Sequence, residues 1–259
     1  MTRTLGLLGT GLLGASIGLR ARECGYRVAG YDTSQESLAI AKQRRAIDEM
    51  ISRDEIYKCD VVVLAIPVDG IVAELERLRD GGASAPQSKL IIDVGSTKRR
   101  ISEIGNRIKN FVPGHPFAGR ERSGAAAADA TLFDGKSWVY VSQGNAHLDQ
   151  RAEEFIREMG SLPYAVDATQ HDAVVACTSH LPQLLAWLFA ERYAEEDPQV
   201  IEALSGPVAR ELQRIARSER PMWREILRAN AENVIREARK LANTLLEKAD
   251  ALERKEEVI

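Results

Sequence analysis

Two histidine-containing segments of this sequence could move protons. His115 stands between two prolines and is followed by glycines, which predicts a rigid loop rather than a place in an apolar core. An imidazole titrates near neutral pH, so it can accept a proton there. His180 lies in the segment 178–183, where Pro182 should kink an otherwise helical stretch. A polar cluster at a kink indicates a lined cavity, although a buried, hydrogen-bonded structural histidine fits the same pattern.

A glycine-rich segment predicts where a dinucleotide would bind. Residues 9–14 read Gly-Thr-Gly-Leu-Leu-Gly and fit the pattern G-x-G-x-x-G between a predicted strand and a predicted helix. Gly9 permits the tight turn, Gly11 lets the backbone approach a pyrophosphate, and Gly14 lets helix and strand pack closely. Asp32 ends the next strand, where a carboxylate binds the ribose 2′-OH and repels a 2′-phosphate, so we expect NAD rather than NADP. A turn or cap role for Asp32 is the alternative. The expected cofactor-binding residues are Gly9, Gly11, Leu12, Leu13, Gly14, Asp32, Pro67 and Ser96.

A second polar turn follows another predicted strand. Residues 93–98 read Asp-Val-Gly-Ser-Thr-Lys, which places Ser96 and Lys98 at the carboxyl edge of the predicted sheet, where open α/β sheets bind ligands. Capping of the following helix is the ordinary use of such a turn. The two remaining histidines, His147 and His171, lie in polar, surface-like segments, and we assign them no role.

The segment 212–223 supplies arginines beside a turn. A guanidinium group binds a carboxylate through a bidentate fork, with charge-assisted hydrogen bonds. Arg214 lies close to the helix face of Leu212 and Ile215, so we expect it to point inward. Exposed arginines on helices are usually only solvated, which is the alternative.

The pattern of elements predicts an α/β fold with two domains. Apolar runs alternate with helical patterns in the first half, which predicts a Rossmann-type, doubly wound, mostly parallel sheet. From about residue 169 only helical periodicity remains, so we expect a Rossmann domain over residues 1–167 and an all-helical domain over residues 168–259. The expected strands are residues 4–8, 27–31, 61–66, 90–94, 138–142 and 164–166; the expected helices are residues 12–23, 34–45, 173–194, 198–217 and 221–252.

The last predicted helix carries a long apolar stripe. The stripe is longer than a small domain covers easily, so we expect a second copy of the chain to cover part of it. A helix solvated on one side and packed on its own domain is the alternative.

Composition excludes several classes of protein. Across 259 residues, 35 lysines and arginines balance 38 aspartates and glutamates, which argues against a general nucleic-acid binder. Three cysteines lie far apart and form no disulfide or zinc pattern, which predicts buried thiols, a reducing cytoplasm and no metal site. The longest apolar run, residues 61–68, falls short of the roughly 20 residues of a membrane span. No leader is evident, so we expect a soluble cytoplasmic protein.

The motifs together resemble the prephenate/arogenate dehydrogenase family of tyrosine biosynthesis. The resemblance implies an NAD-binding Rossmann domain, a helical dimerisation domain and an active site between them. It also implies oxidative decarboxylation of a cyclohexadienol, without a metal. The matching segments occur in the family's order: residues 9–16, residues 93–98, residues 115–119 with Glu121 and Gly124, residues 179–183, and residues 214–218 with Met222, Trp223 and Asn230.

The resemblance also implies roles for five residues. His115 would take the proton of the ring hydroxyl as hydride leaves the same carbon for NAD. Ser96 would orient that hydroxyl or His115. His180 and Arg214 would hold the substrate side chain, with Arg214 on its carboxylate, and Glu121 would lie at the mouth of the pocket.

The expected reaction converts prephenate to 4-hydroxyphenylpyruvate. An arogenate dehydrogenase, or a cyclohexadienyl dehydrogenase of dual specificity, would use the same residues. Glu121 could favour the ammonium group of arogenate, whereas Arg120, where the family often has a small polar residue, disfavours it, so we favour prephenate. Two further alternatives are a β-hydroxyacid or imine-type dehydrogenase and a non-catalytic NAD-binding protein. We expect no fused mutase or regulatory domain.

Overall fold

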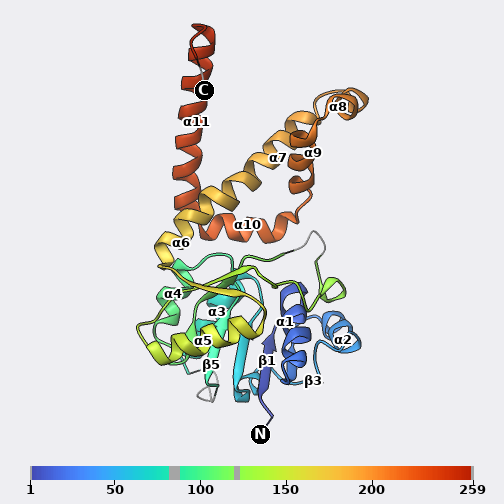
Figure 1. The fold of residues 1–259 in the computed structure, drawn as a ribbon, viewed down its shortest axis with the longest axis vertical. Helices are drawn as coiled ribbons and strands as arrows, with labels where there is room; N and C mark the ends of the chain where they lie inside the picture. Colours follow the sequence, from blue (N-terminus) through green and yellow to red (C-terminus); the bar gives the residue numbers. More distant parts are fainter. Residues whose placement is uncertain (1, 82–87, 120–122, 258–259) are drawn as a thin grey trace. The chain divides into compact units, whose positions relative to one another are not determined.

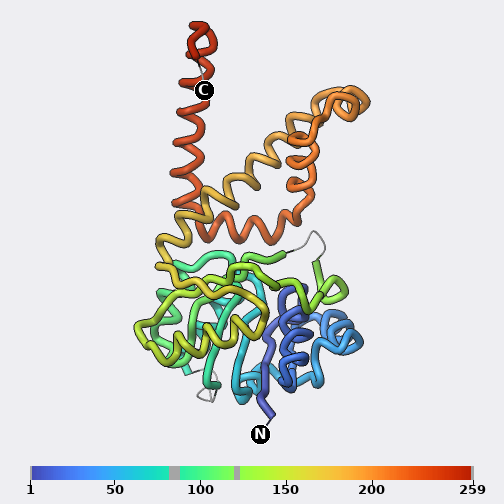
Figure 2. Tube along the Cα trace, in the orientation of Figure 1, coloured from blue at the N-terminus to red at the C-terminus, as the bar shows by residue number. Residues whose placement is uncertain are grey.

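The chain divides into two compact units. The computed structural model describes residues 2–81, 88–119 and 123–257, and its units are Met1–His171 and Asp172–Ile259 (Figure 1). The trace runs from blue to yellow through the first unit and on to red through the second (Figure 2). The boundary expected after residue 167 falls at the start of helix α6 (Ala168–Val175), four residues before this division.

The first unit is built on a parallel sheet. Within the described residues, six strands pair in parallel in the order β3-β2-β1-β4-β5-β6. The order reverses between β1 and β4, and open α/β sheets bind ligands at such a switch point. The predicted doubly wound sheet is confirmed, although β3 and β6 are too short to leave a periodic signal. The strands are β1 (Thr4–Leu8), β2 (Arg27–Tyr31), β3 (Glu49–Met50), β4 (Val61–Leu64), β5 (Leu90–Asp93) and β6 (Phe111–Val112).

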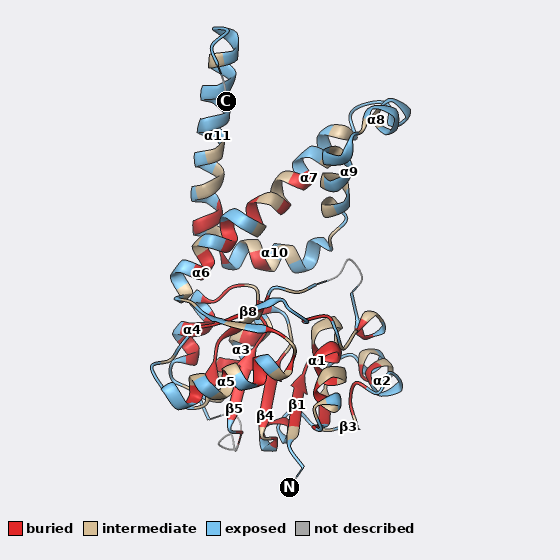
Figure 3. Ribbon diagram, in the orientation of Figure 1, coloured by how far each residue is buried: buried red, intermediate tan, exposed pale blue. Residues whose placement is uncertain are grey.

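Apolar residues alternate between the two faces of this sheet. Leu7 belongs to the core layer under one set of helices and Leu8 to the layer under the other, because successive side chains of a strand point to opposite faces. Figure 3 shows the buried positions concentrated in the strands and on the inner sides of the helices. One face is covered by α1 (Leu12–Glu23), α2 (Gln35–Gln43) and α5 (Ala146–Glu158), the other by α3 (Val68–Arg79) and α4 (Arg99–Gly105).

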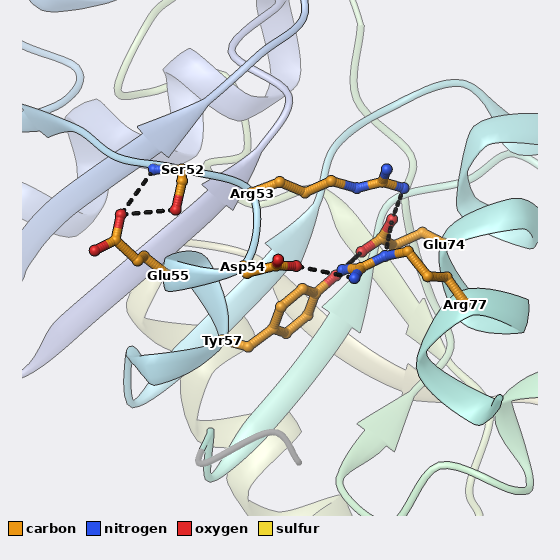
Figure 4. A network of polar contacts seen from close by, with 7 residues as sticks. All are labelled: Ser52, Arg53, Asp54, Glu55, Tyr57, Glu74 and Arg77. Atoms are coloured by element: carbon orange, nitrogen blue, oxygen red, sulfur yellow. Dashed lines mark hydrogen bonds and ion pairs between the residues drawn. The ribbon is translucent and has the colours of Figure 1, made fainter. Parts of the chain in front are cut away.

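A buried carboxylate ties α3 to the segment before β4 (Figure 4). Glu74 is fully buried and accepts hydrogen bonds from Tyr57 Oη at 2.5 Å, from Arg77 Nη2 at 2.7 Å and from Arg53. Burial acts to raise the pKa of Glu74, but these three donors outweigh it and leave that pKa below its usual value. Arg77 also pairs with Asp54 at 2.9 Å, so the network extends to the surface.

A smaller second sheet carries His115. Strand β7 (Gly114–Pro116) pairs antiparallel with β8 (Ser137–Tyr140), and β8 pairs parallel with β9 (Leu162–Ala165). His115 lies opposite Val139 in this register. The prediction of a rigid loop at His115 is therefore wrong. Three residues flanked by prolines are too few to show a strand alternation, and the pairing with β8 is decided only by the tertiary fold.

The second unit is all-helical. Pro182 has no N–H and its ring clashes with the preceding turn, and the predicted interruption takes the form of a π-helical segment over the five residues before α7. The helix expected over residues 198–217 is two helices, because Gly206 is extended before Pro207. The helix expected over residues 221–252 is also two, divided at Asn230. Its segments are η3 (Ala176–His180), α7 (Leu181–Tyr193), α8 (Pro198–Leu204), α9 (Pro207–Ala216), α10 (Arg220–Ala229) and α11 (Ala231–Glu253).

One helical stretch is more apolar than its longest uninterrupted run suggested. Among the described residues, Ala168–Tyr193 is long and apolar enough to cross a membrane by length and composition, and 39% of its apolar window is buried inside the protein. Gln183 Nε2 donates to Ile215 O and Trp187 Nε1 to Ala216 O, each at 3.0 Å. These hydrogen bonds join α7 to α9, as expected of a helix in the core of a helical unit.

The cysteines only partly fit the prediction of buried thiols. Cys59 is buried, and burial raises the pKa of its thiol to about 11. Cys24 is half-buried, whereas Cys177 is exposed on the π-helical segment. The prediction is wrong for Cys177, because an apolar sequence context does not show which side of a helix faces solvent.

Candidate functional site

The glycine turn after β1 has the geometry of a dinucleotide loop. Gly9 has a φ of +99°, and a Cβ atom there would lie 2.2 Å from Ala65 O. A Cβ atom on Gly14 would lie 2.1 Å from Gly9 O, so neither position tolerates a side chain. A Cβ atom on Gly11 would meet no described atom within 4 Å, which leaves the backbone open to a ligand. No side chain among the described residues caps the first turn of α1, so its N–H groups can bind an anion.

Asp32 is held at the end of β2 by this turn. Its Oδ2 accepts from Thr10 N at 2.7 Å and from Thr10 Oγ1 at 3.1 Å, and its Oδ1 accepts from Ser34 N at 2.9 Å. The carboxylate therefore joins the glycine turn to the start of α2. A carboxylate has about four lone-pair directions, so Asp32 can still accept a ribose hydroxyl.

A fully buried ion pair fixes the turn after β5. Asp93 and Lys98 are both 0% exposed and form a salt bridge. Burial raises the pKa of Asp93, and this effect is opposed by the Lys98 ammonium and by the N–H groups of Gly95 at 2.7 Å and Gly114 at 2.9 Å. Ser96 lies between the two charged residues and is half-buried.

The same pair positions the strand that carries His115. Gly114 N donates to Asp93 Oδ1 at 2.9 Å, and Lys98 Nζ donates to Gly114 O at 2.6 Å. Both backbone polar groups of the residue before His115 are thereby bound to the turn after β5. His115 is held at the carboxyl edge of the parallel sheet, the side on which the glycine turn also lies.

A second histidine contacts His115. His115 Nδ1 and His171 Nε2 are 3.0 Å apart, a hydrogen-bond distance. The two rings meet edge-on, with centroids 5.2 Å apart, and Phe117 packs against the His115 ring at 4.6 Å. His115 is half-buried and His171 is buried. The sequence interpretation, which assigned His171 no role, missed this pair.

His180 lies in the interior of the helical unit. It is 1% exposed, its Nδ1 lies 3.1 Å from Asn230 Nδ2, and its ring meets Trp223 edge-on at 6.0 Å. Asn230 Nδ2 also donates to Asp172 O at 2.7 Å. Within this unit His180 has the environment of the alternative interpretation, a buried and hydrogen-bonded histidine. Its predicted contact with substrate stays a prediction.

Arg214 does not face the interior of its unit. Its side chain is 47% exposed, and its Nε and Nη2 donate to the two carboxylate oxygens of Glu211 at 2.8 and 2.5 Å. The expected inward orientation is wrong for this unit, because α9 turns its Leu212 and Ile215 side toward α7 while Arg214 lies along the exposed side. Glu121 and Arg120 lie outside the described residues.

The first unit thus brings most of the expected site residues to one edge of its sheet. Ser96 and His115 lie at the ends of β5 and β7, and the glycine turn and Asp32 follow β1 and β2. Pro67 begins α3 directly after β4 and is exposed. Sequence reasoning missed the Asp93–Lys98 pair although it singled out the segment 93–98. The spacing showed which residues lie at the edge but not that these two bind each other.

Two family models match almost the whole chain. The nucleotide-binding domain of prephenate dehydrogenase matches residues 16–161, and the dimerization domain of prephenate dehydrogenase matches residues 167–257. The chain belongs to the prephenate dehydrogenase family. The first unit therefore carries the family's nucleotide-binding domain and the helical unit its dimerization domain.

Individual members of the family agree with this assignment. A prephenate dehydrogenase of Lactococcus lactis subsp. cremoris is 32% identical over 87% of this chain and 64% of its own, and a cyclohexadienyl dehydrogenase of Zymomonas mobilis is 30% identical over 88% and 80%. The crystal structure of the Aquifex aeolicus prephenate dehydrogenase with hydroxyphenyl propionate and NAD+ is 25% identical, with a TM-score of 0.88, over 98% of this chain and 92% of that one. The chain spans 64% to 67% of the length of three curated relatives, the Lactococcus protein among them.

Proposed function

We propose that this protein is an NAD-dependent dehydrogenase that oxidatively decarboxylates prephenate to 4-hydroxyphenylpyruvate. The observation that carries the proposal is His115, half-buried and fixed at the carboxyl edge of a dinucleotide-binding sheet, in a chain of this family. The Lactococcus and Aquifex relatives bear the name of this activity.

The described residues fit NAD as the cofactor. The open space beside Gly11 and the uncapped first turn of α1 suit a pyrophosphate. Asp32 is held where it can accept a ribose hydroxyl and repel a 2′-phosphate, so NAD is favoured over NADP. Pro67 and Ser96 begin the turns after β4 and β5 on the same edge of the sheet. When bound, NAD supplies the acceptor for the hydride.

His115 acts as the general base. It takes the proton of the ring hydroxyl while the hydrogen on the same carbon leaves as hydride, so the carbon becomes a carbonyl. The bond to the ring carboxylate then breaks and CO₂ departs. Its electron pair makes the ring aromatic and the carbonyl a phenolate, which is protonated to the product phenol. Ser96 orients the hydroxyl or His115, and general-base help of this kind is worth about 10²–10⁴-fold in rate.

His180 and Arg214 bind the substrate side chain in this proposal. The Nε and Nη2 edge of Arg214 that now holds Glu211 is the edge that binds a carboxylate in a bidentate fork. Glu121 lies at the mouth of the pocket. The same machinery serves arogenate, and the name of the Zymomonas relative fits an enzyme of dual specificity, so the choice between the two substrates is left to assay.

The helical unit joins two copies of the chain into a homodimer, and the enzyme acts as a soluble protein of the cytoplasm. The dimerization-domain match and the exposed apolar residues support this part of the proposal. The apolar residues of α8, α9 and α11 that are at least half exposed, or nearly so, are Val200, Leu204, Val208, Ile235, Leu245, Leu246 and Leu252.

Substrate oxidation tests the proposal directly. The purified protein is incubated with NAD and either prephenate or arogenate, and NADH absorbance is followed. We expect turnover of prephenate, its loss in His115→Asn, and unchanged NAD affinity in that variant. His147→Asn is the matched control, because His147 is exposed on α5, and it should keep full activity. Full activity in His115→Asn, or no turnover of either substrate, would contradict the proposal.

A further inference from the structure

His171 approaches His115 because a helix cap and a strand pairing both place it there. Asp167 caps the start of α6, accepting at Oδ1 from Thr169 N at 2.9 Å and from Gln170 N at 3.0 Å. His171 N then donates to Asp167 O at 2.8 Å, which puts the His171 ring one turn into the helix. This cap follows directly on β9, the strand paired with β8, which in turn pairs with β7 and its His115. His171 is held by backbone structure and is 3% exposed.

The contact has consequences for the tautomer of His115. A neutral imidazole carries one proton, and the partner of one ring nitrogen decides which nitrogen holds it. If His115 Nδ1–H donates to His171 Nε2, the proton lies on Nδ1 and Nε2 keeps the lone pair that a base needs. If His171 donates instead, His115 carries its proton on Nε2 and cannot accept one there.

We propose that His171 is the positioning residue of the reaction, accepting a hydrogen bond from His115 Nδ1–H and so fixing His115 as the Nδ1–H tautomer with Nε2 as the base. The inference rests on the proposed function only in naming what His115 does. The hydrogen bond also becomes charge-assisted once His115 has taken the substrate proton, so it strengthens as the base becomes imidazolium. A group that orients a catalytic imidazole through its second nitrogen serves the same purpose in other enzymes, where a carboxylate takes that place.

Nitrogen NMR of the imidazole rings tests the tautomer without any substrate. The chain has four histidines, so each ring is assigned by its own substitution. In the wild-type protein at a pH where His115 is neutral, we expect its proton on Nδ1. His171→Leu removes the acceptor and should move that proton toward Nε2. His171→Gln places an amide oxygen within reach of the same position and should keep the proton on Nδ1. A wild-type His115 protonated on Nε2 overturns the inference without recourse to any variant.

Kinetics separate positioning from a merely structural role. We expect His171→Leu to lower kcat about 10²-fold, with the KM for substrate and the NAD affinity nearly unchanged, since a misaligned base slows the chemical step rather than binding. His171→Gln should recover most of the activity, and His147→Leu, at an exposed position, should change nothing. Unchanged kcat in a folded His171→Leu, or equal losses in the Leu and Gln variants, would overturn the inference.

The two proposals fail in different ways. A wild-type protein that oxidises neither prephenate nor arogenate, but holds the proton on Nδ1 and loses it from Nδ1 in His171→Leu, supports the positioning of His115 and refutes the proposed function. Turnover of prephenate combined with a tautomer that does not respond to His171 refutes the positioning and leaves the function standing.

Discussion

Removal of the Lys98 ammonium should show how strongly the buried ion pair holds the edge of the sheet. Lys98→Met keeps the length of the side chain but leaves the Asp93 carboxylate fully buried with only the N–H groups of Gly95 and Gly114 as donors. The loss of one partner of a buried pair costs about 3–5 kcal/mol, which for a domain of this size lowers the Tm by about 10 °C. The free energy of unfolding in urea measures the loss.

Lys89→Met is the matched control for this substitution. Lys89 pairs with Asp60 at 2.6 Å, but its side chain is 65% exposed. A pair of this kind contributes about 0–1 kcal/mol, because water screens both charges. The two variants carry the same chemical change, so the difference between them isolates the effect of burial.

The pH dependence gives a second, independent check. Burial already raises the pKa of Asp93, and without Lys98 nothing cationic opposes that effect. In Lys98→Met the folded-state pKa of Asp93 therefore lies further above its unfolded value, and the folded protein binds the proton more tightly. Stability then falls as pH rises through this window, so the deficit of the variant shrinks on acidification. The double variant Asp93→Asn/Lys98→Met, which buries no charge, should regain much of the loss. A Lys98→Met protein as stable as Lys89→Met, or a deficit independent of pH, would refute the reasoning.

Other substitutions test the glycine turn and the Glu74 network. Gly11→Ala should leave the Tm nearly unchanged but weaken NAD binding in calorimetry, because its methyl group would enter only the space expected for the cofactor. Gly14→Ala should cost about 1–3 kcal/mol in urea unfolding even without NAD, because its methyl group would collide with Gly9 O. Glu74→Gln should cost about 1–3 kcal/mol near neutral pH, since three donors lose a charged acceptor. The pKa of Glu74 is lowered by folding, so its stabilisation is lost as pH falls through the folded pKa, and the two unfolding curves should converge in acid.

Much of the first unit follows from local sequence signals. The strand at residues 4–8 and the helix at residues 12–23 occur as expected, because alternating apolar residues and the glycine turn determine them over a few neighbouring positions. The expected strands at residues 61–66 and 90–94 end earlier, at Leu64 and Asp93, where the chain turns into the ligand-binding edge. Long helices were overextended, since helix-forming residues continue through breaks such as Gly206 and Asn230.

The inner contacts of the site depend on residues far apart in the chain. His115 and His171 are separated by 56 positions, and Lys98 and Gly114 by 16. No periodicity or motif shows that such residues touch, because the pairing of β7, β8 and β9 brings them together. The exposure of Arg214 and the burial of His180 depend in the same way on how α7 and α9 pack.

The sequence by itself therefore determined the dinucleotide fold, the position of its glycine turn, the acid at the end of the second strand and the histidine expected to act as base. Each of these is encoded by residues close together along the chain, where turn chemistry and strand alternation act directly. Only the tertiary structure decided what holds that histidine: a buried Asp93–Lys98 pair bound to the backbone before it, and a second imidazole against its ring. Hydrogen bonds between distant segments form only after the strands have paired, so they leave no local pattern in the sequence.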